Sequence, residues 1–212
     1  MVDWDDEPLM WDDPYGLVFI GGDLEPDSLL GAYRRGIFPW FNEDDPFLWW
    51  SPEPRSIFEF ETLHFSRRLM RVVRQGKFTI TINQAFADVM RSCALRDEGT
   101  WITPEMYEAY CQLHELGHAH SVEAWRQGNL VGGVYGVAVG GFFAAESMFH
   151  LETDAGMVAL FALTQRLQER SFTLFDTQMA TDHTRQLGAV DVSRTEYLTR
   201  LAQALRIAAD FA

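Results

Sequence analysis

The feature that most constrains the fold is a change of hydrophobic period near Ser121. Before it, Thr103-Pro104-Glu105 predicts a helix start, with a capping threonine, an early proline and an acid near the positive end of the dipole, and Gly117 predicts its end. After it, SVEAWRQGNLVGGVYGVAVGGFFAAESMF predicts antiparallel strands that break at residues 127–129 and 140–141. The chain therefore combines helices with a mostly antiparallel sheet.

The flanking segments supply further helices and strands. Towards the N-terminus we predict a short helix that begins at Pro26, a strand SIFEF, a helix opened by Ser66 and closed by Gly76, a strand FTITI and a helix over 83–95. We expect residues 1–62, an acidic segment and an aromatic loop, to belong to a smaller domain that extends to about residue 95. Residues 96–212 would form the second, catalytic domain.

The second domain continues with a helix over 154–170, a strand FTLFD and a last helix from Ser193, whose hydroxyl can form a capping box with Glu196. This order of elements is typical of a GNAT-like acyltransferase. The fold class is therefore α/β (α+β), with a small N-terminal α/β domain followed by a GNAT-like acyltransferase domain.

Composition predicts an ordinary globular protein. Of 212 residues, 47% are hydrophobic and 14% aromatic, which is enough for a substantial core. No run of about 18 apolar residues predicts a membrane span. The acidic start does not resemble a signal peptide, so we expect a cytoplasmic protein. Cys93 and Cys111 are too few for a disulfide framework and are interpreted as reduced.

Residues 33–55, YRRGIFPWFNEDDPFLWWSPEPR, hold seven aromatic residues and four prolines without regular periodicity. The prolines favour an extended, non-helical frame. The rings of Trp40, Phe41, Trp49 and Trp50 on such a frame suit stacking on a flat ligand or lining an apolar pocket. The alternative is that these rings only fill a domain interface.

Charge is distributed unevenly along the chain. The net charge of −14 disfavours nucleic acid on average, and residues 1–45 hold twelve acids against two arginines. The segment 63–78, LHFSRRLMRVVRQGKF, carries five basic residues and no acid. They are Arg67, Arg68, Arg71, Arg74 and Lys77. Helical spacing places Arg67, Arg71 and Arg74 on one face, which is either a phosphate-binding surface or a solvated amphipathic face.

The segment His114-Glu115-Leu116-Gly117-His118 matches the zinc signature in which two histidines one turn apart bind the metal. The motif needs a helix that continues through both histidines, but Gly117 lies between them and extended sequence follows. His120 lies too near to complete the usual site. Possible third ligands are His150, His183, Glu123 and Glu146.

A second pattern is spread over the chain. The segments GGDLEPDSLLGAYRRGIFPWF, DPFLWWSPEPR, LHFSRRL, EGTWITPEMYEAYCQLHELGHAHSVEAW, LVGGVYGVAVGGFF, ESMF and FDTQ together closely resemble the leucyl/phenylalanyl-tRNA–protein transferase family. The resemblance covers nearly the whole of residues 16–205. In that family HELGHAHS is a helix-to-strand junction and not a metal site.

The resemblance implies a bacterial enzyme that transfers leucine, phenylalanine or sometimes methionine from aminoacyl-tRNA to proteins whose N-terminal residue is arginine or lysine. The products are marked for N-degron degradation. The family uses no metal or nucleotide cofactor. We expect a monomer with no membrane partner.

The resemblance also implies site residues. Asp176 and Gln178 match the family's catalytic strand end, where the aspartate could orient or deprotonate the amine and the glutamine could hold the amine or the carbonyl. Glu146 would lie on an adjacent strand. Either Glu146 or Asp176 could instead bind the cationic side chain of the acceptor, and the sequence leaves their roles open.

Substrate contacts follow from the same resemblance. Trp40 and Trp101 match the rings that frame the terminal adenosine and the aminoacyl side chain, and Phe143 is expected in the same cavity. Trp49, Ser147 and Met148 are further substrate-binding candidates. The five basic residues of segment 63–78 would contact tRNA phosphates without reading bases.

Three motifs depart from the family pattern. Ala145 stands where glycine is usual and could narrow the cleft. Gly156 and Met157 replace a serine and a lysine, so tRNA could bind more weakly or through other contacts. Thr177 replaces a cysteine on the face opposite the catalytic groups.

Three alternatives remain at this stage. A zinc peptidase would use the HELGH motif. A GNAT enzyme that uses acyl-CoA would need a glycine-rich pyrophosphate turn, which ETDAGMV at 152–158 lacks. An RNA-binding module would bind tRNA without transfer.

Overall fold

A computed structural model describes residues 1–95 and 100–212, so part of the predicted domain boundary at 95–96 lies outside the described residues. The larger of two sheets has seven strands. In spatial order they are β10 (Ala189–Val192), β4 (Arg55–Phe58), β9 (Leu174–Gln178), β8 (Phe142–His150), β7 (Asn129–Val139), β6 (Ala119–Arg126) and β5 (Thr79–Ile82). Neighbouring strands are antiparallel except β8 and β9, which are parallel. The predicted mixed α/β class with a mostly antiparallel sheet is confirmed.

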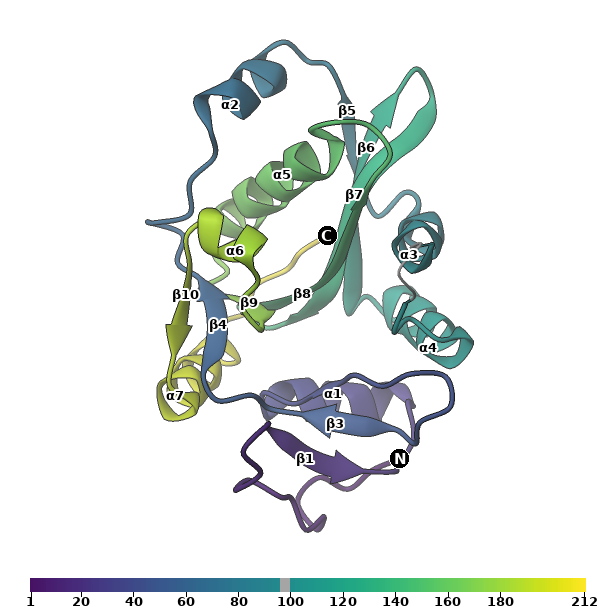
Figure 1. Cartoon of the computed structure of the whole chain (residues 1–212), viewed down its shortest axis with the longest axis vertical. Coiled ribbons are helices and arrows are strands. Elements are labelled where there is room, and N and C mark those ends of the chain that lie inside the picture. The colour runs from purple at the N-terminus through teal and green to yellow at the C-terminus, as the bar shows by residue number, and fades with distance from the viewer. Residues whose placement is uncertain (96–99) are drawn as a thin grey trace.

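Helices cover both faces of the larger sheet (Figure 1). The helices are α1 (Pro26–Arg34), α2 (Arg67–Arg74), α3 (Phe86–Ala94), α4 (Pro104–Glu115), α5 (Ala155–Glu169), α6 (Asp182–Gln186) and α7 (Arg194–Ala204). Helix α5 packs on β6 and β7 from one side, whereas α3 and α4 pack on the other. Among the described residues, none of these helices is both long and apolar enough to cross a membrane.

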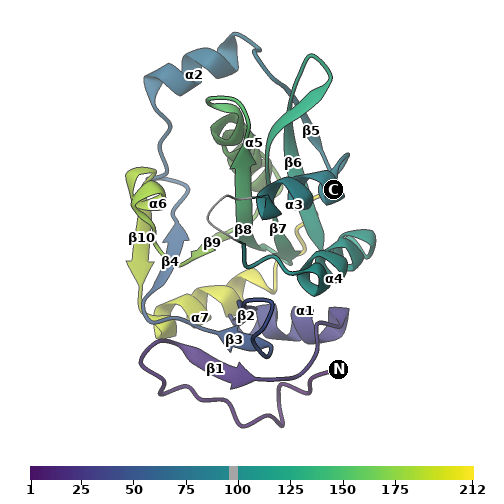
Figure 2. The ribbon, with the colours of Figure 1, turned by 45° about the vertical axis from the view of Figure 1, so that its right-hand side comes forward.

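The small sheet contains β1 (Leu17–Ile20), β3 (Leu48–Trp50) and β2 (Phe38–Pro39). Together with α1 it forms one end of the molecule, and α2 lies at the opposite end in both ribbon views (Figures 1 and 2). The chain passes from the small sheet to the large sheet between Trp50 and Arg55, since β4 and β5 both belong to the large sheet. The predicted boundary near residue 95 is therefore not where the architecture divides.

Local sequence signals explain several element ends. The side chains of Ser66, Thr103 and Ser193 accept hydrogen bonds from backbone N–H groups three residues later, which confirms the predicted starts of α2, α4 and α7. At the hairpin between β6 and β7, Gln127 and Gly128 have φ of 51° and 79°, a turn that follows the twist of the strands. This predicted hairpin is also confirmed.

Other elements differ from the sequence prediction. The aromatic stretch contains the short strands β2 and β3. Phe38 lies opposite Trp50 and Pro39 opposite Trp49, so the two strands pair even though the stretch is rich in proline. Strands β1 and β10 and helix α6 had not been predicted. They are four or five residues long, too short for a hydrophobic period to be read with certainty.

Candidate active site

The two parallel strands in the middle of the sheet separate and leave a cleft. Strands β8 and β9 pair from Phe142 opposite Leu174 to Ala144 opposite Asp176, and no further. Each strand is irregular directly after this point. On β8, Glu146 is skipped in the register with β7, and on β9, Thr177 is skipped in the register with β4. Bulges of this kind bend a strand and redirect its side chains.

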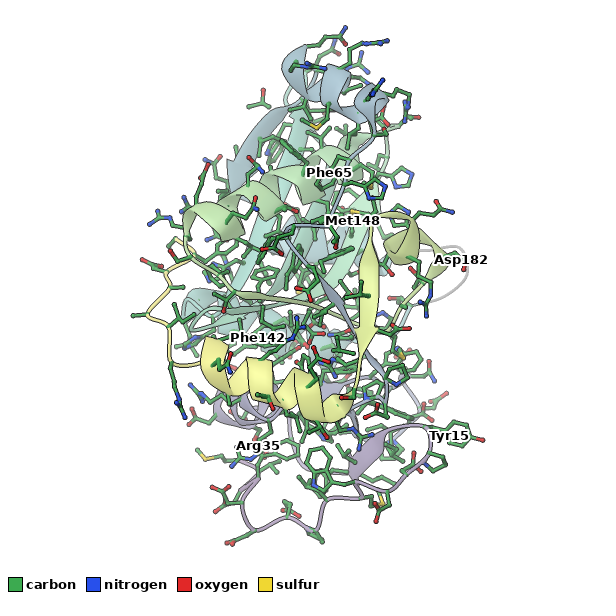
Figure 3. All side chains as sticks on the ribbon, turned by 90° about the vertical axis from the view of Figure 1, so that its left-hand side faces the viewer. Tyr15, Arg35, Phe65, Phe142, Met148 and Asp182 are labelled. Carbon is green, nitrogen blue, oxygen red and sulfur yellow. The ribbon has the colours of Figure 1, made fainter. Side chains whose placement is uncertain are left out.

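A cavity of about 370 Å³ occupies this cleft, and we call it the central cavity. One side carries Ala145, Glu146, Ser147 and Met148 of β8, and the other carries Thr177, Gln178 and Met179 from the end of β9. Apolar residues from the sheet and α5, namely Phe58, Val134 and Leu160, complete its wall, and His183 and Thr184 of α6 lie at its edge. Figure 3 views the molecule from a side on which Met148 and Asp182, the first residue of α6, are labelled.

A second cavity of about 230 Å³ adjoins the first towards the small sheet, and we call it the tryptophan cavity. It is lined by Phe38, Pro39 and Trp40 from the small sheet and its flank and by Trp101. It shares Trp101, Glu146, Thr177, Gln178, Met179 and Thr181 with the central cavity. The Trp40 ring is 40% exposed, so it can stack on a ligand.

Glu146 is the carboxylate that both cavities share. Its Oε1 accepts hydrogen bonds from the Tyr33 hydroxyl at 2.7 Å and from Gln178 Nε2 at 2.9 Å. The Tyr33 hydroxyl donates its hydrogen bond to Glu146. The Tyr110 hydroxyl must therefore be the donor in its 2.5 Å contact with the Tyr33 hydroxyl. The other oxygen, Oε2, is buried and has no hydrogen-bond partner among the described residues. Burial raises the pKa of Glu146 to about 7, although the bonds from Tyr33 and Gln178 lower it.

Asp176 has a different environment, since its side chain is fully buried. Its two oxygens accept bonds from Arg55 Nε at 2.9 Å and Arg55 Nη2 at 2.6 Å, and Tyr197 donates a third at 2.9 Å. Burial lowers the pKa of the Arg55 guanidinium, but the charge of Asp176, its hydrogen bonds with Arg55 and the neighbouring Tyr197 and Glu146 together outweigh burial, and the net shift is upward. A carboxylate enclosed in this way does not reach a substrate, so the structure does not support direct contact of Asp176 with the amine.

Asp176 acts on the cavity through Gln178. Its Oδ1 accepts the backbone N–H of Gln178 at 2.8 Å, and Gln178 has a left-handed φ of 62°, which is costly for a residue with a side chain. The bulge at Thr177 also places that residue in both cavities, and not on an opposite face as the alternation had predicted. Asp176 is therefore a positioning residue.

Two predicted contact residues lie elsewhere. Phe143 is fully buried and stacks on Phe211 with ring centroids 5.4 Å apart, on the far side of β8 from Glu146. Trp49 is also fully buried and donates its ring N–H to the Gly21 carbonyl at 2.9 Å. Neither residue lines the two cavities, and Phe143 packs instead among the rings of Phe172, Phe175 and Phe211. The predictions for Trp40, Trp101, Ser147 and Met148 as cavity residues agree with the structure.

The basic residues of α2 fall into two groups. Arg67, Arg71 and Arg74 are exposed and form no ion pair among the described residues. Arg68 is paired with Asp154, and Lys77 lies 3.7 Å from Glu152. The predicted three-residue face is therefore present, while the charges of Arg68 and Lys77 are partly compensated.

The HELGH segment is a helix end. Helix α4 stops at Glu115 and Gly117 has φ of 81°, as predicted from the glycine. The His114 ring stacks on Phe86 at 4.3 Å and its Nδ1 donates to the Ala119 carbonyl at 2.7 Å. Glu123, a proposed third ligand, is buried and accepts hydroxyl bonds from Ser121 and Thr81. Across residues 1–95 and 100–212, no three His, Cys, Asp or Glu side chains form a group that could hold a metal ion.

Sequence reasoning missed Arg55, Tyr197, Tyr33 and Tyr110. The three tyrosines lie on different helices, and their chemistry depends on contacts between segments up to 142 residues apart. Arg55 opens an apolar strand, and a lone arginine at such a place could have suggested a buried ion pair.

The cleft in this mixed α/β fold joins an apolar wall to the carboxylate of Glu146, which gives the molecule a candidate active site. The chain matches the family models "Leucyl/phenylalanyl-tRNA protein transferase" over residues 57–202 and "Leucyl/phenylalanyl-tRNA protein transferase N-terminal domain" over residues 22–53. The chain belongs to the leucyl/phenylalanyl-tRNA–protein transferase family. The prediction of the family and of an aminoacyltransferase is thereby confirmed.

Individual relatives agree. A leucyl/phenylalanyl-tRNA–protein transferase of Shewanella denitrificans is 52% identical over 90% of this chain and 82% of the relative, and one of Hydrogenovibrio crunogenus is 51% identical over 92% and 78%. Likeness to solved structures is weak. A ribosomal-protein-alanine N-acetyltransferase from Brucella melitensis biovar Abortus has a TM-score of 0.34 and 19% identity, covering 45% of this chain and 75% of that one.

Proposed function

We propose that this protein transfers leucine, phenylalanine or methionine from aminoacyl-tRNA to the N-terminal amine of proteins that begin with arginine or lysine. The products would enter N-degron degradation, and the enzyme would act as a cytoplasmic monomer. The observation that carries the proposal is the position of Glu146, a partly buried carboxylate residue that lines both the central cavity with its apolar wall and the tryptophan cavity.

The apolar wall of the central cavity supports the proposed donors. Val134, Leu160 and Met148 can contact a hydrophobic side chain of the donor. These three wall residues present no polar group that would need a hydrogen bond from it. Such a pocket separates side chains that differ by a methylene by only about 1–3 kcal/mol. Acceptance of leucine, phenylalanine and methionine follows naturally from this chemistry.

In the proposed reaction the acceptor amine attacks the ester carbonyl carbon, a C–N bond forms, and the C–O bond to the terminal ribose breaks. The amine loses a proton, and the ribose oxygen leaves as a hydroxyl. Glu146 Oε2 takes the amine proton and returns it to the ribose oxygen as the C–O bond breaks. Its pKa of about 7 is close to the reference value of an N-terminal amine, about 7.7–8.0, so the transfer is nearly balanced. Tyr33 and Gln178 hold the other oxygen in place.

Charge supports the proposed acceptor. The net charge is −14, and the acid-rich segment 1–45 includes Trp40 of the tryptophan cavity. A field of this sign attracts cationic N-termini and raises their local concentration. The uncompensated Arg67, Arg71 and Arg74 at the other end of the molecule provide a separate surface for tRNA phosphates.

The test follows labelled leucine from Leu-tRNA to a peptide that begins with arginine. Controls are the same peptide with aspartate first and an N-acetylated arginine peptide, which lacks the attacking amine. We expect label on the free arginine peptide alone. Absence of label with Leu-, Phe- and Met-tRNA and folded protein would reject the proposal, and zinc-dependent peptide cleavage lost in His114→Ala would favour the peptidase alternative.

A further inference from the structure

A third cavity, of about 220 Å³, lies between the start of α2, the first turn of α5 and helix α6, and we call it the histidine cavity. It is lined by His64, Ser66, Arg68, Met157, His183 and Gln186, together with Leu69, Leu187 and Asp154. Its position in the fold is between the central cavity and the arginines of α2. No step of the proposed aminoacyl transfer uses it.

The polar lining consists mostly of groups that can donate hydrogen bonds: two imidazoles, a serine hydroxyl, a glutamine amide and a guanidinium. The one acid is turned away from a ligand. The Asp154 side chain is 8% exposed and both its oxygens bind Arg68, at 2.9 and 2.5 Å, whereas the Arg68 side chain is 66% exposed. A guanidinium has five N–H groups, so Arg68 keeps donors for an anion after binding Asp154.

The cavity is continuous with its two neighbours. His183 and Leu187 line both the histidine cavity and the central cavity. On the other side, the chain runs from Ser66 directly into α2 and its exposed Arg67, Arg71 and Arg74. An aminoacyl-tRNA whose aminoacyl group lies in the central cavity and whose acceptor duplex lies on α2 must pass over the histidine cavity.

We propose that the histidine cavity binds the phosphodiester and ribose of the nucleotide that precedes the aminoacylated one. The donors face the phosphate and ribose hydroxyls, and Leu69, Leu187 and Met157 contact the sugar. Contacts of this kind position the strand and do not depend on base identity. This inference rests on the proposed use of aminoacyl-tRNA and adds a site that distinguishes a nucleotide chain from a single nucleoside.

The test compares three donors: leucyl-adenosine, leucyl-cytidylyl-adenosine and Leu-tRNA. Variants are His64→Ala and Gln186→Ala, which change exposed side chains of the histidine cavity and of neither other cavity. For each we expect KM to rise about three- to tenfold with the dinucleotide and the tRNA, the change expected from the loss of one hydrogen bond at an exposed site. KM with leucyl-adenosine should stay unchanged.

A gain-of-function variant gives an independent readout. Met157→Lys adds a cation to the cavity wall, and we expect a lower KM for the dinucleotide and the tRNA and a salt dependence steeper by about one unit of slope. Leu116→Lys, an exposed position at the end of α4 outside the three cavities, is the matched charge control and should not change the dinucleotide KM.

The outcomes separate the two proposals. Absence of transfer from all three donors with the wild-type protein contradicts the proposed function itself. Transfer with equal effects of the variants on leucyl-adenosine and on the longer donors overturns the histidine cavity as a nucleotide site. So does a change confined to the KM of the acceptor peptide, which would assign the cavity to the acceptor.

Discussion

Two carboxylates lie where strands β8 and β9 separate, and their surroundings are opposite. Asp176 on β9 is enclosed by Arg55 and Tyr197 and has no exposed surface. Within residues 1–95 and 100–212, Glu146 on β8 has only neutral hydrogen-bond donors and keeps one oxygen without a partner, and its pKa is about 7. We therefore propose that Asp176, the acid with the stronger contacts, has a structural role, and that Glu146, the acid with incomplete contacts, accepts a proton.

The largest expected effect comes from removing the partner of Asp176. Arg55→Met should lower the free energy of unfolding by about 3–5 kcal/mol, because it leaves a buried charge without its counter-ion. Denaturant unfolding measures the change. The double variant Arg55→Met/Asp176→Asn should recover part of the loss, and a double variant no more stable than the single one would show that the pair does not act as described.

Removing the other carboxylate should affect rate and not folding. Glu146→Gln should lower kcat/KM by about 100-fold or more, the usual contribution of a positioned base. Its melting temperature at pH 7 should not fall, since the amide needs no desolvated charge. Glu152→Gln, in the turn between β8 and α5, is the matched control and should keep its activity. Wild-type activity in Glu146→Gln would remove Glu146 from the reaction.

The pH dependence sharpens the same contrast. The pKa of Glu146 is raised from 4.5 to about 7, mainly by burial, so the folded protein binds a proton that the unfolded chain has lost. This stabilisation is complete below pH 4.5 and is lost as pH rises through 7, while activity should increase over the upper part of that range. Thermal melts give the stability and kcat/KM gives the activity, each measured at several pH values between about 5 and 8. In Glu146→Gln the fall in stability over this window should disappear.

A smaller effect is expected from the tyrosine that holds Glu146. The Tyr33 hydroxyl lowers the pKa of Glu146, so Tyr33→Phe should move the midpoint of the activity profile to higher pH. Loss of the two buried hydrogen bonds of this hydroxyl, to Glu146 and from Tyr110, should also cost about 1–3 kcal/mol of stability. Tyr197→Phe, which removes a bond to Asp176, should leave the midpoint in place. Equal shifts in both variants would contradict the separation of the two carboxylates.

The smallest effect concerns cavity shape. A Cβ at Gly156 would lie 2.9 Å from the Phe149 carbonyl oxygen and 3.3 Å from the Met148 sulfur, and Met148 lines the central cavity. Gly156→Ala should therefore shift Met148 and change the ratio of kcat/KM for Phe-tRNA and Leu-tRNA by a few-fold, on the order of 1 kcal/mol. Ala202→Gly on exposed α7 is a control for altered backbone freedom and should not alter that ratio.

Local sequence determined much of this molecule. Caps at Ser66, Thr103 and Ser193, the glycine at 117 and the hairpin at Gln127 depend on contacts within a few residues, and each lies where the sequence predicts. The arginine face of α2 follows in the same way from helical spacing. The motif pattern also indicated the family without any coordinates.

Tertiary structure decided how these parts work. Whether Glu146 or Asp176 is free to take a proton depends on Arg55, Tyr197 and Tyr33, which come from distant segments and carry no local signature. The bulges that place Thr177 in the cleft, and the alternation that buries Phe143, depend on the register between strands. Sequence alone could name the chemical groups because their identity is local, but their burial and pairing are properties of the folded chain.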